Sequence, residues 1–206
     1  MDENGAKIVG ASCLLWWGSS LVLEVQKPDK WIALDDGTVQ IGLGCVGGSL
    51  EPGESAVEAL QREAVEEIGC RLDLRDAPVT YAVTPAAQVG EREWRFPGVR
   101  PALVWEACLP GLVPGRRVAV FLGRCTAEPA PGDLPALLLV RPALLFAIGP
   151  GDLDLAQARE QGAELRTREP VPDSVRLALV GTPAVLSLLK AKGEPIAETL
   201  SAPIRP

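Results

Sequence analysis

Three glutamates share one face of a short segment, and their spacing suggests a binding site for a divalent cation. Glu63, Glu66 and Glu67 stand at positions i, i+3 and i+4, which in a helix places their carboxylates within roughly 100° of arc. Like charges at this spacing repel one another, and negative charge is also disfavoured near a helix C-terminus. Mg²⁺ and Mn²⁺ prefer oxygen ligands and would relieve the repulsion. A solvated acidic face is the other interpretation that these three residues allow.

A glycine-rich segment lies ahead of the glutamates and can complete such a site. Gly47 and Gly48 permit backbone conformations that are closed to other residues, so a carbonyl or amide there can approach a cation or a phosphate. Arg62 follows Glu54 by eight residues, about two helical turns. A salt bridge between these two side chains would hold the loop and the helix in one geometry.

The surrounding elements mix helices and strands. Residues 55–68 predict a helix, because Ser55 can cap its start, Gly69 can end it and no proline or glycine intervenes. Residues 7–26 predict a hairpin that turns at Gly18. Further strands are expected at residues 31–34, 38–46, 78–84, 102–107, 118–125 and 136–140, and further helices at 153–161 and 183–192. Without a regular β-α-β alternation, the fold class is α+β or a mixed-sheet sandwich.

Composition excludes several kinds of function. The 206 residues carry a formal net charge of −7, which argues against a partner that is a nucleic-acid polymer. There is no histidine, so Ser-His-Asp and Cys-His catalysis and imidazole zinc sites are excluded. Five cysteines without a C-x-x-C pair predict reduced thiols. The N-terminus lacks the layout of a signal peptide and no apolar run reaches about 18 residues, so we expect a cytoplasmic protein that does not enter the membrane.

The combined pattern over residues 48–70 resembles the signature of the Nudix hydrolases. The positions that match it are Gly48, Glu54, Arg62, Glu63, Glu66, Glu67 and Gly69, with Ala64 and Cys70 in the apolar positions. The resemblance implies the Nudix fold, a mixed β-sheet sandwiched between helices, which we expect over residues 1–150. We interpret residues 151–206 as a C-terminal helical extension packed on the same domain.

The resemblance also implies a reaction, the hydrolysis of a nucleoside diphosphate linked to another moiety, with Mg²⁺ or Mn²⁺ as the cofactor. It implies that Glu63, Glu66 and Glu67 bind the cations together with the carbonyl of Gly47. Catalytic or supporting roles are implied for Glu54, Arg62, Glu66 and Glu67. Because histidine is absent, the general base is a carboxylate or a metal-bound hydroxide. The carboxylates open to this role are Glu66, Glu67, Glu91, Glu93, Glu106 and Glu128.

The substrate is expected to be a small-molecule nucleotide. Pro85 lies fifteen residues after Cys70, a spacing that resembles the ADP-ribose pyrophosphatase subgroup, so an ADP-ribose-like compound is favoured. Arg92, Trp94 and Arg95 are candidates for contacting phosphates or stacking on a base. The alternative function is a non-catalytic Nudix-like domain that binds a nucleotide or a protein. A homodimer through the apolar N-terminal strands or the C-terminal helix is compatible with the sequence.

Overall fold

Two N-terminal strands form the centre of a mixed β-sheet. The structure is a computed structural model that describes residues 7–92, 96, 98–106 and 115–202. β1 (Ile8–Trp17) is apolar on both sides because successive side chains alternate, so Leu14 and Trp16 enter one core while Cys13 and Leu15 enter the other. Gly18, at φ 58°, turns the chain into β2 (Ser20–Val25), which confirms the predicted hairpin.

The sheet extends to both sides of this hairpin in the order β12-β11-β2-β1-β10-β9-β7-β8, with β3, β4, β5, β6 and β13 paired to members of this series. β1 pairs with β10 in parallel, as do β4 with β13 and β7 with β9, whereas the other pairs are antiparallel. The remaining strands are β3 (Ile32–Ala33), β4 (Val39–Cys45), β5 (Gly47–Ser49), β6 (Leu72–Arg75), β7 (Thr80–Val83), β8 (Val89–Arg92), β9 (Leu103–Glu106), β10 (Arg117–Cys125), β11 (Ala136–Val140), β12 (Glu164–Thr167) and β13 (Arg176–Leu179).

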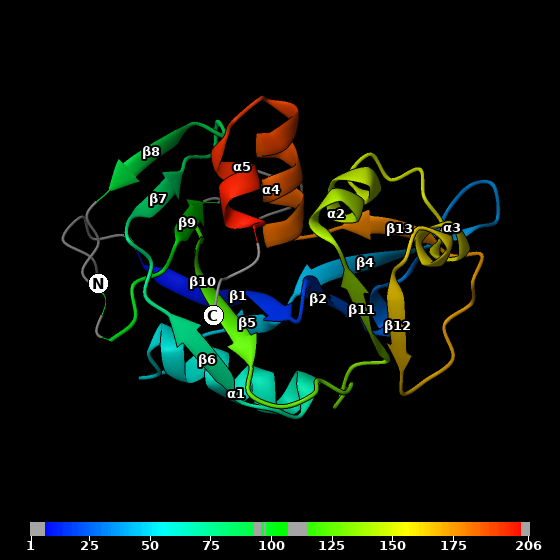
Figure 1. Ribbon diagram of the computed structural model, residues 1–206, viewed down its shortest axis with the longest axis horizontal. Helices are drawn as coiled ribbons and strands as arrows, with labels where there is room; N and C mark the ends of the chain where they lie inside the picture. The colour runs from blue at the N-terminus through cyan, green and yellow to red at the C-terminus, as the bar shows by residue number, and fades with distance from the viewer. Residues whose placement is uncertain (1–6, 93–95, 97, 107–114, 203–206) are drawn as a thin grey trace.

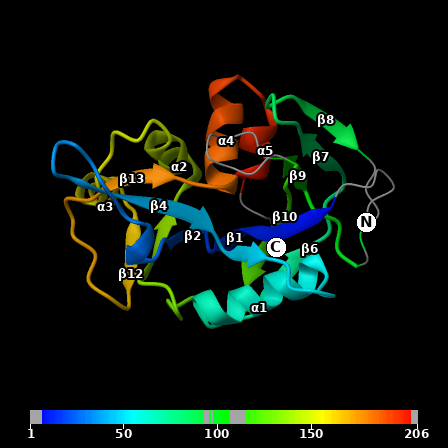
Figure 2. The same cartoon turned by 180° about the vertical axis from the view of Figure 1, so that it is seen from behind.

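Helices cover both faces of the sheet. α1 (Ala56–Ile68) lies on one face, and α2 (Pro142–Ile148), α4 (Thr182–Ala191) and α5 (Ile196–Leu200) lie on the other, as Figure 1 shows and Figure 2 repeats from behind. α1 buries Leu60, Ala64 and Ile68 in one hydrophobic core, and α4 contributes Val185 and Leu186 to the second. The expected α+β class, with a mixed sheet between helices, is confirmed.

The helix that carries the three glutamates has well-defined ends. The amide of Glu58 donates to the Ser55 hydroxyl at 3.3 Å, and the amide of Ser55 donates to the Glu58 carboxylate at 2.9 Å, which forms a capping box. Gly69 ends the helix in the left-handed conformation at φ 68°. Both ends lie where the sequence predicts them.

The loop after β10 closes the C-terminus of α1. The amides of Gly132 and Asp133 donate to the carbonyls of Glu67 and Glu66 at 2.8 and 2.9 Å. The amide of Ala130 donates to the carbonyl of Ile68 at 3.2 Å. These carbonyls have no partner within the helix, so the loop supplies their hydrogen bonds. A Cβ at Gly132 would overlap the carbonyl oxygen of Glu66, and a glycine is therefore needed for this approach.

The C-terminal region is not only helical, and this part of our expectation was wrong. Besides α3 (Leu155–Glu160), α4 and α5, residues 151–206 contain β12, which pairs with β11, and β13, which pairs in parallel with β4. These strands are short and carry polar residues, so pairing with the sheet decides their conformation rather than a hydrophobic pattern of their own. Among the helices that the structure describes, none is long and apolar enough to traverse a lipid bilayer.

Candidate active site

The glycine-rich strand β5 lies between β1 and α1. Gly47 pairs opposite Ser12 and adopts φ 144°, and a Cβ there would overlap the backbone of β1. A Cβ at Gly48 would overlap the carboxylate of Glu63. The two glycines therefore bring the backbone of β5 directly against the acidic face of the helix, which is the close approach that the sequence suggested.

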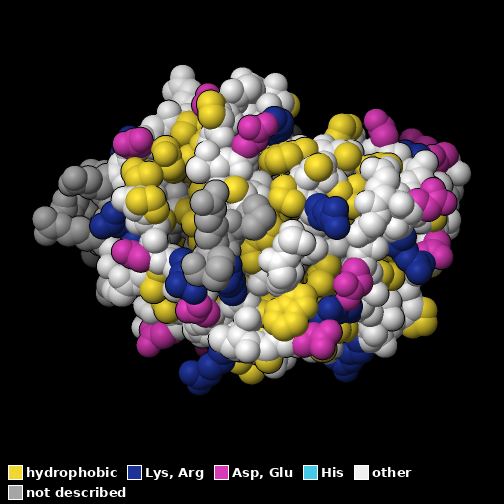
Figure 3. All heavy atoms as spheres, in the orientation of Figure 1, with side chains coloured by type: hydrophobic (Ala, Val, Ile, Leu, Met, Phe, Trp, Pro, Cys, Tyr) yellow, Lys and Arg dark blue, Asp and Glu magenta, His cyan; other side chains and the backbone are white. Residues whose placement is uncertain are grey.

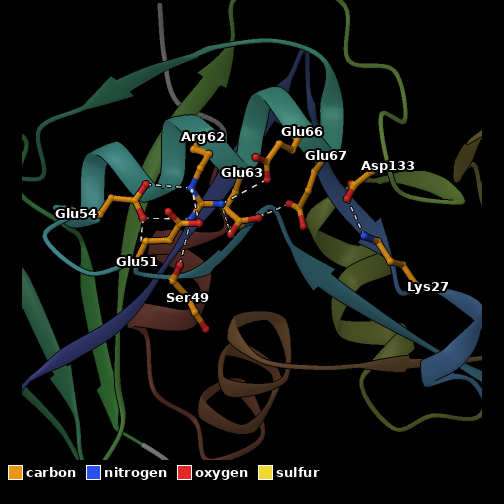
Figure 4. A network of polar contacts seen from close by, with 10 residues as sticks. Lys27, Ser49, Glu51, Glu54, Arg62, Glu63, Glu66, Glu67 and Asp133 are labelled. Atoms are coloured by element: carbon orange, nitrogen blue, oxygen red, sulfur yellow. Dashed lines mark hydrogen bonds and ion pairs between the residues drawn. The ribbon is translucent and has the colours of Figure 1, made fainter.

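Arg62 joins this strand and loop to the helix. Its Nε and Nη2 donate to the two carboxylate oxygens of Glu54 at 3.0 and 3.1 Å, and Nη2 also donates to the Ser49 carbonyl at 3.2 Å. Nη1 donates to Glu63 at 2.9 Å and to Glu66 at 3.4 Å (Figure 4). The predicted Glu54–Arg62 ion pair is thus present, and the Arg62 guanidinium lowers the pKa of the Glu54 carboxyl.

Glu67 points inward, away from this arginine. Only 8% of the residue is exposed, and its Oε2 accepts a hydrogen bond from the amide of Gly47 at 3.0 Å. The carboxyl of Glu24 on β2 lies next to the Glu67 carboxyl and interacts with it electrostatically. Burial raises the pKa of both carboxyls, and the charge of Glu24 further raises the pKa of Glu67. The two carboxyls thus lie together, Glu67 buried and Glu24 half-buried, where ionisation of both is costly.

Glu24 is the acid that our sequence analysis missed. It lies opposite Gly44 on β4, where a Cβ would overlap its carboxylate. The available signal was a single charged residue within the apolar strand Leu21–Val25. This residue is half-buried and lies beside the Glu67 carboxyl of α1.

The donor set fits a divalent cation. Within the described residues, no three acidic or cysteine side chains close around one point, because Arg62 holds Glu63 and Glu66 while Glu67 faces Glu24. All four acids nevertheless offer carboxylate oxygens, the donors that Mg²⁺ and Mn²⁺ prefer. A cation here would also offset the charge that makes ionisation of Glu24 and Glu67 costly.

A cavity of about 490 Å³ opens beside this cluster. Glu24, Gly47 and Gly48 belong to its wall, so one of the four acids and the two glycines beside α1 border the cavity. Its other lining residues are Val9, Gly10, Ala11, Ser12, Gln26, Gly44, Cys45, Ser49, Trp105, Arg116, Val118, Val180, Gly181 and Thr182. The size and the mixture of apolar walls with a few polar groups are typical of a small-molecule site.

Of the predicted substrate residues, the structure describes Arg92, and this residue does not line the cavity. Arg92 is exposed on the edge strand β8 and is not part of the lining, whereas Trp94 and Arg95 lie outside the described residues. Pro85 is exposed in the turn between β7 and β8. The hydroxyls of Ser12 and Thr182, which do line the cavity, were missed because their positions in the sequence carry no motif.

The other candidate general bases lie elsewhere or are already paired. Glu106 forms an ion pair with Arg117 at 3.0 Å, and Glu128 forms one with Arg166 at 3.1 Å. Glu91 is exposed on β8, and Glu93 lies outside the described residues. Of the candidate general bases that the structure describes, Glu66 and Glu67 are the two that lie at the carboxylate cluster.

Comparison with known proteins identifies the family. A model described as the NUDIX domain matches residues 9–112, half of the 206-residue chain. The protein therefore belongs to the Nudix hydrolase family, as the residue pattern predicted, and all signature positions lie within the matched range. A comparison with curated proteins gave no match.

The solved structures that this chain matches include several proteins described as NUDIX hydrolases. The solution structure of the E. coli ORF135 protein is 16% identical, covers 70% of this chain and 81% of its own, and has a TM-score of 0.40. A NUDIX-family hydrolase from Clostridium perfringens is 15% identical over 68% of this chain and 84% of its own, with a TM-score of 0.43. A NUDIX hydrolase from Nitrosomonas europaea is 15% identical, covers 84% of this chain and 80% of its own, and has a TM-score of 0.38.

Proposed function

We propose that this Nudix protein is a cation-dependent pyrophosphohydrolase that cleaves a nucleoside diphosphate linked to another moiety. The observation that carries the proposal is the position of Glu63, Glu66 and Glu67 beside β5, at the edge of a cavity that can hold a small molecule. A buried Glu67 carboxyl beside the half-buried Glu24 is costly for a purely structural protein, and a cationic cofactor would offset that cost.

Each residue of the cluster has a role in this proposal. Glu63, Glu66, Glu67 and the carbonyl of Gly47 would hold Mg²⁺ or Mn²⁺, and Glu24 would join them from β2. When bound, the cation would offset the charge of the pyrophosphate and lower the pKa of a water molecule. A raised pKa makes an ionised carboxylate a stronger base, so Glu24 or Glu67, once ionised, would accept the proton of the attacking water.

Arg62 and Glu54 would support catalysis without touching the substrate. Their bidentate pair, together with the bond from Arg62 to the Ser49 carbonyl, fixes β5 against α1. This contact keeps the Gly47 carbonyl and the helix glutamates at a constant separation. Loss of Arg62 would also remove the guanidinium with which both Glu63 and Glu66 form ion pairs.

We further propose that the partner is a small-molecule nucleotide, and an ADP-ribose-like compound is the first to test. We also propose a cytoplasmic location and a homodimer. On the face drawn in Figure 3, basic and acidic side chains of the described residues are intermixed. That distribution favours a small ligand over a nucleic-acid polymer, which requires clustered basic residues. Residues 1–150 and 151–206 would act as one unit, because both contribute strands to the same sheet.

The test is a hydrolysis assay with identification of the products. ADP-ribose, NADH, dinucleoside polyphosphates, nucleotide sugars and oxidised nucleotides would be incubated with Mg²⁺ or Mn²⁺, and with EDTA as the cation-free control. We expect cation-dependent cleavage of at least one compound. Glu67→Gln should lower kcat by about two or more orders of magnitude, as loss of a residue that supports the transition state does.

Glu160→Gln is the matched control, because Glu160 is an exposed glutamate at the end of the short helix α3. It should leave kcat unchanged, and both variants should keep the far-ultraviolet circular dichroism of the wild type. Nucleotide binding without any cleavage would instead favour the non-catalytic alternative. Near-wild-type activity of Glu67→Gln would contradict the role of Glu67 as a ligand.

A further inference from the structure

We propose that the cavity binds the heteroaromatic base of a nucleotide, and that the hydroxyl pair of Ser12 and Thr182 determines its specificity by donating one hydrogen bond. The inference rests on the proposed function, since it assigns the part of the substrate that is not hydrolysed. Thr182 and Ser12 are 3% and 8% exposed, and both line the cavity.

A count of protons shows why this pair can donate to a ligand. The hydroxyl oxygens of Ser12 and Thr182 are 2.8 Å apart, and the indole Nε1 of Trp105 donates to Thr182 Oγ1 at 3.0 Å. The three side chains carry three polar protons, but these contacts use only two. Whichever hydroxyl donates to the other, one O–H proton remains, and no acceptor among the described residues takes it. A ligand in the cavity can supply that acceptor.

Most of the wall suits a flat apolar group. Trp105, Val118 and Val180 provide apolar surface, and an aromatic ring gains from contact with it. The lining also includes the basic side chain of Arg116 and, at the side next to the cation cluster, the carboxyl of Glu24. A base in the cavity would leave the pyrophosphate near β5 and the helix glutamates, since Gly47 and Gly48 border both regions.

Thr182 comes from a part of the chain beyond the family match at residues 9–112. It begins α4, and the preceding Gly181 adopts φ 58°, a conformation that favours glycine. The amide of Val180 donates to the Leu43 carbonyl at 2.9 Å, which fixes this junction against β4. The C-terminal region therefore supplies a recognition group to a site whose acids come from the matched region.

The experiment measures binding apart from hydrolysis. AMP, GMP, CMP and UMP would be titrated into the wild-type protein in EDTA by isothermal titration calorimetry, with ribose 5-phosphate as the probe that lacks a base. We expect at least one nucleotide to bind more tightly than ribose 5-phosphate. Removing the donor in Thr182→Val or Ser12→Ala should weaken that binding about three- to ten-fold, the range for one hydrogen bond.

Two controls separate recognition from folding. Thr182→Ser keeps the hydroxyl and should bind within about two-fold of the wild type. Thr80→Val removes another buried threonine hydroxyl, which donates to the Pro101 carbonyl at 2.6 Å away from the cavity lining, and should leave binding unchanged. Circular dichroism would verify that each variant is folded, and Ser12→Ala provides the test if Thr182→Val is not.

The outcomes distinguish the two proposals. Equal binding of ribose 5-phosphate and all four nucleotides would overturn the inference, as would unchanged binding in every folded Ser12 and Thr182 variant. Base-dependent binding without hydrolysis under any cation would leave this inference standing and refute the proposed function. Hydrolysis of a nucleotide whose base does not affect binding would support the proposed function and overturn this inference.

Discussion

The loop that closes the C-terminus of α1 offers a direct test of how the acidic face is held in position. Gly132→Ala adds a Cβ where the Glu66 carbonyl oxygen already lies, so the loop has to move away from the helix. The movement would break the bonds from the amides of Gly132 and Asp133 to the carbonyls of Glu67 and Glu66, which measure 2.8 and 2.9 Å. The helix end that carries two proposed ligands would then lose its cap.

The expected size follows from the two hydrogen bonds. At about 1 kcal/mol each, with some additional strain, the variant should lose about 2–3 kcal/mol of unfolding free energy. For a chain of this length such a loss corresponds to a decrease in Tm of about 4–12 °C. Because Glu66 and Glu67 shift with their backbone, the affinity for Mn²⁺, measured by electron paramagnetic resonance, should also fall by about ten-fold, as it does when the support of a metal ligand is removed.

Gly90→Ala is the matched control. Gly90 lies in β8, where no atom surrounds an added Cβ within 4 Å and φ is not positive. This variant should keep the Tm and the Mn²⁺ affinity of the wild type within the error of the measurements. The reasoning would be refuted if Gly132→Ala also matched the wild type in both, because the loop would then not hold the helix end.

Three further predictions concern the cluster itself. Gly48→Ala places a Cβ on the Glu63 carboxylate and should weaken Mn²⁺ binding by about ten-fold at unchanged secondary structure; equal affinity would contradict the close approach. Arg62→Lys removes the bidentate contact and should lower kcat/KM about ten-fold or more, which unchanged kinetics would exclude. The third prediction concerns pH in the presence of EDTA. Because the pKa values of Glu24 and Glu67 are raised in the native state, that state binds more protons than the unfolded state. The unfolding free energy should therefore fall as the pH rises from the ordinary pKa of a glutamate through the raised pKa values of these two residues. Glu67→Gln should reduce this slope in denaturation at several pH values, and an unchanged slope would contradict the pairing.

Local chemistry was sufficient to predict the helix and the contacts within it. Ser55 and Gly69 mark the two ends of α1, and the spacing of Glu54 and Arg62 predicted their ion pair. These features depend on residues within about twenty positions of one another, so a single stretch of sequence contains all the partners. The same is true of the β1–β2 hairpin, whose turn residues lie between two apolar strands.

Contacts between distant segments could not be predicted in this way. Glu24 meets Glu67 only because β2 pairs with β4 near β5, and no spacing in the sequence reports that proximity. Thr182 reaches Ser12 and Trp105 only because β13 pairs with β4 and carries the start of α4 to the cavity.

The amino-acid sequence by itself therefore determined the acidic helix, its caps and the family, since each depends on local spacing and propensity. The tertiary structure alone decided which other groups join that helix. Short strands such as β13 are stabilised by pairing with the sheet rather than by their own composition. The pairing of β2 with β4 brings the fourth acid to the site, and the pairing of β13 with β4 brings the Thr182 hydroxyl there.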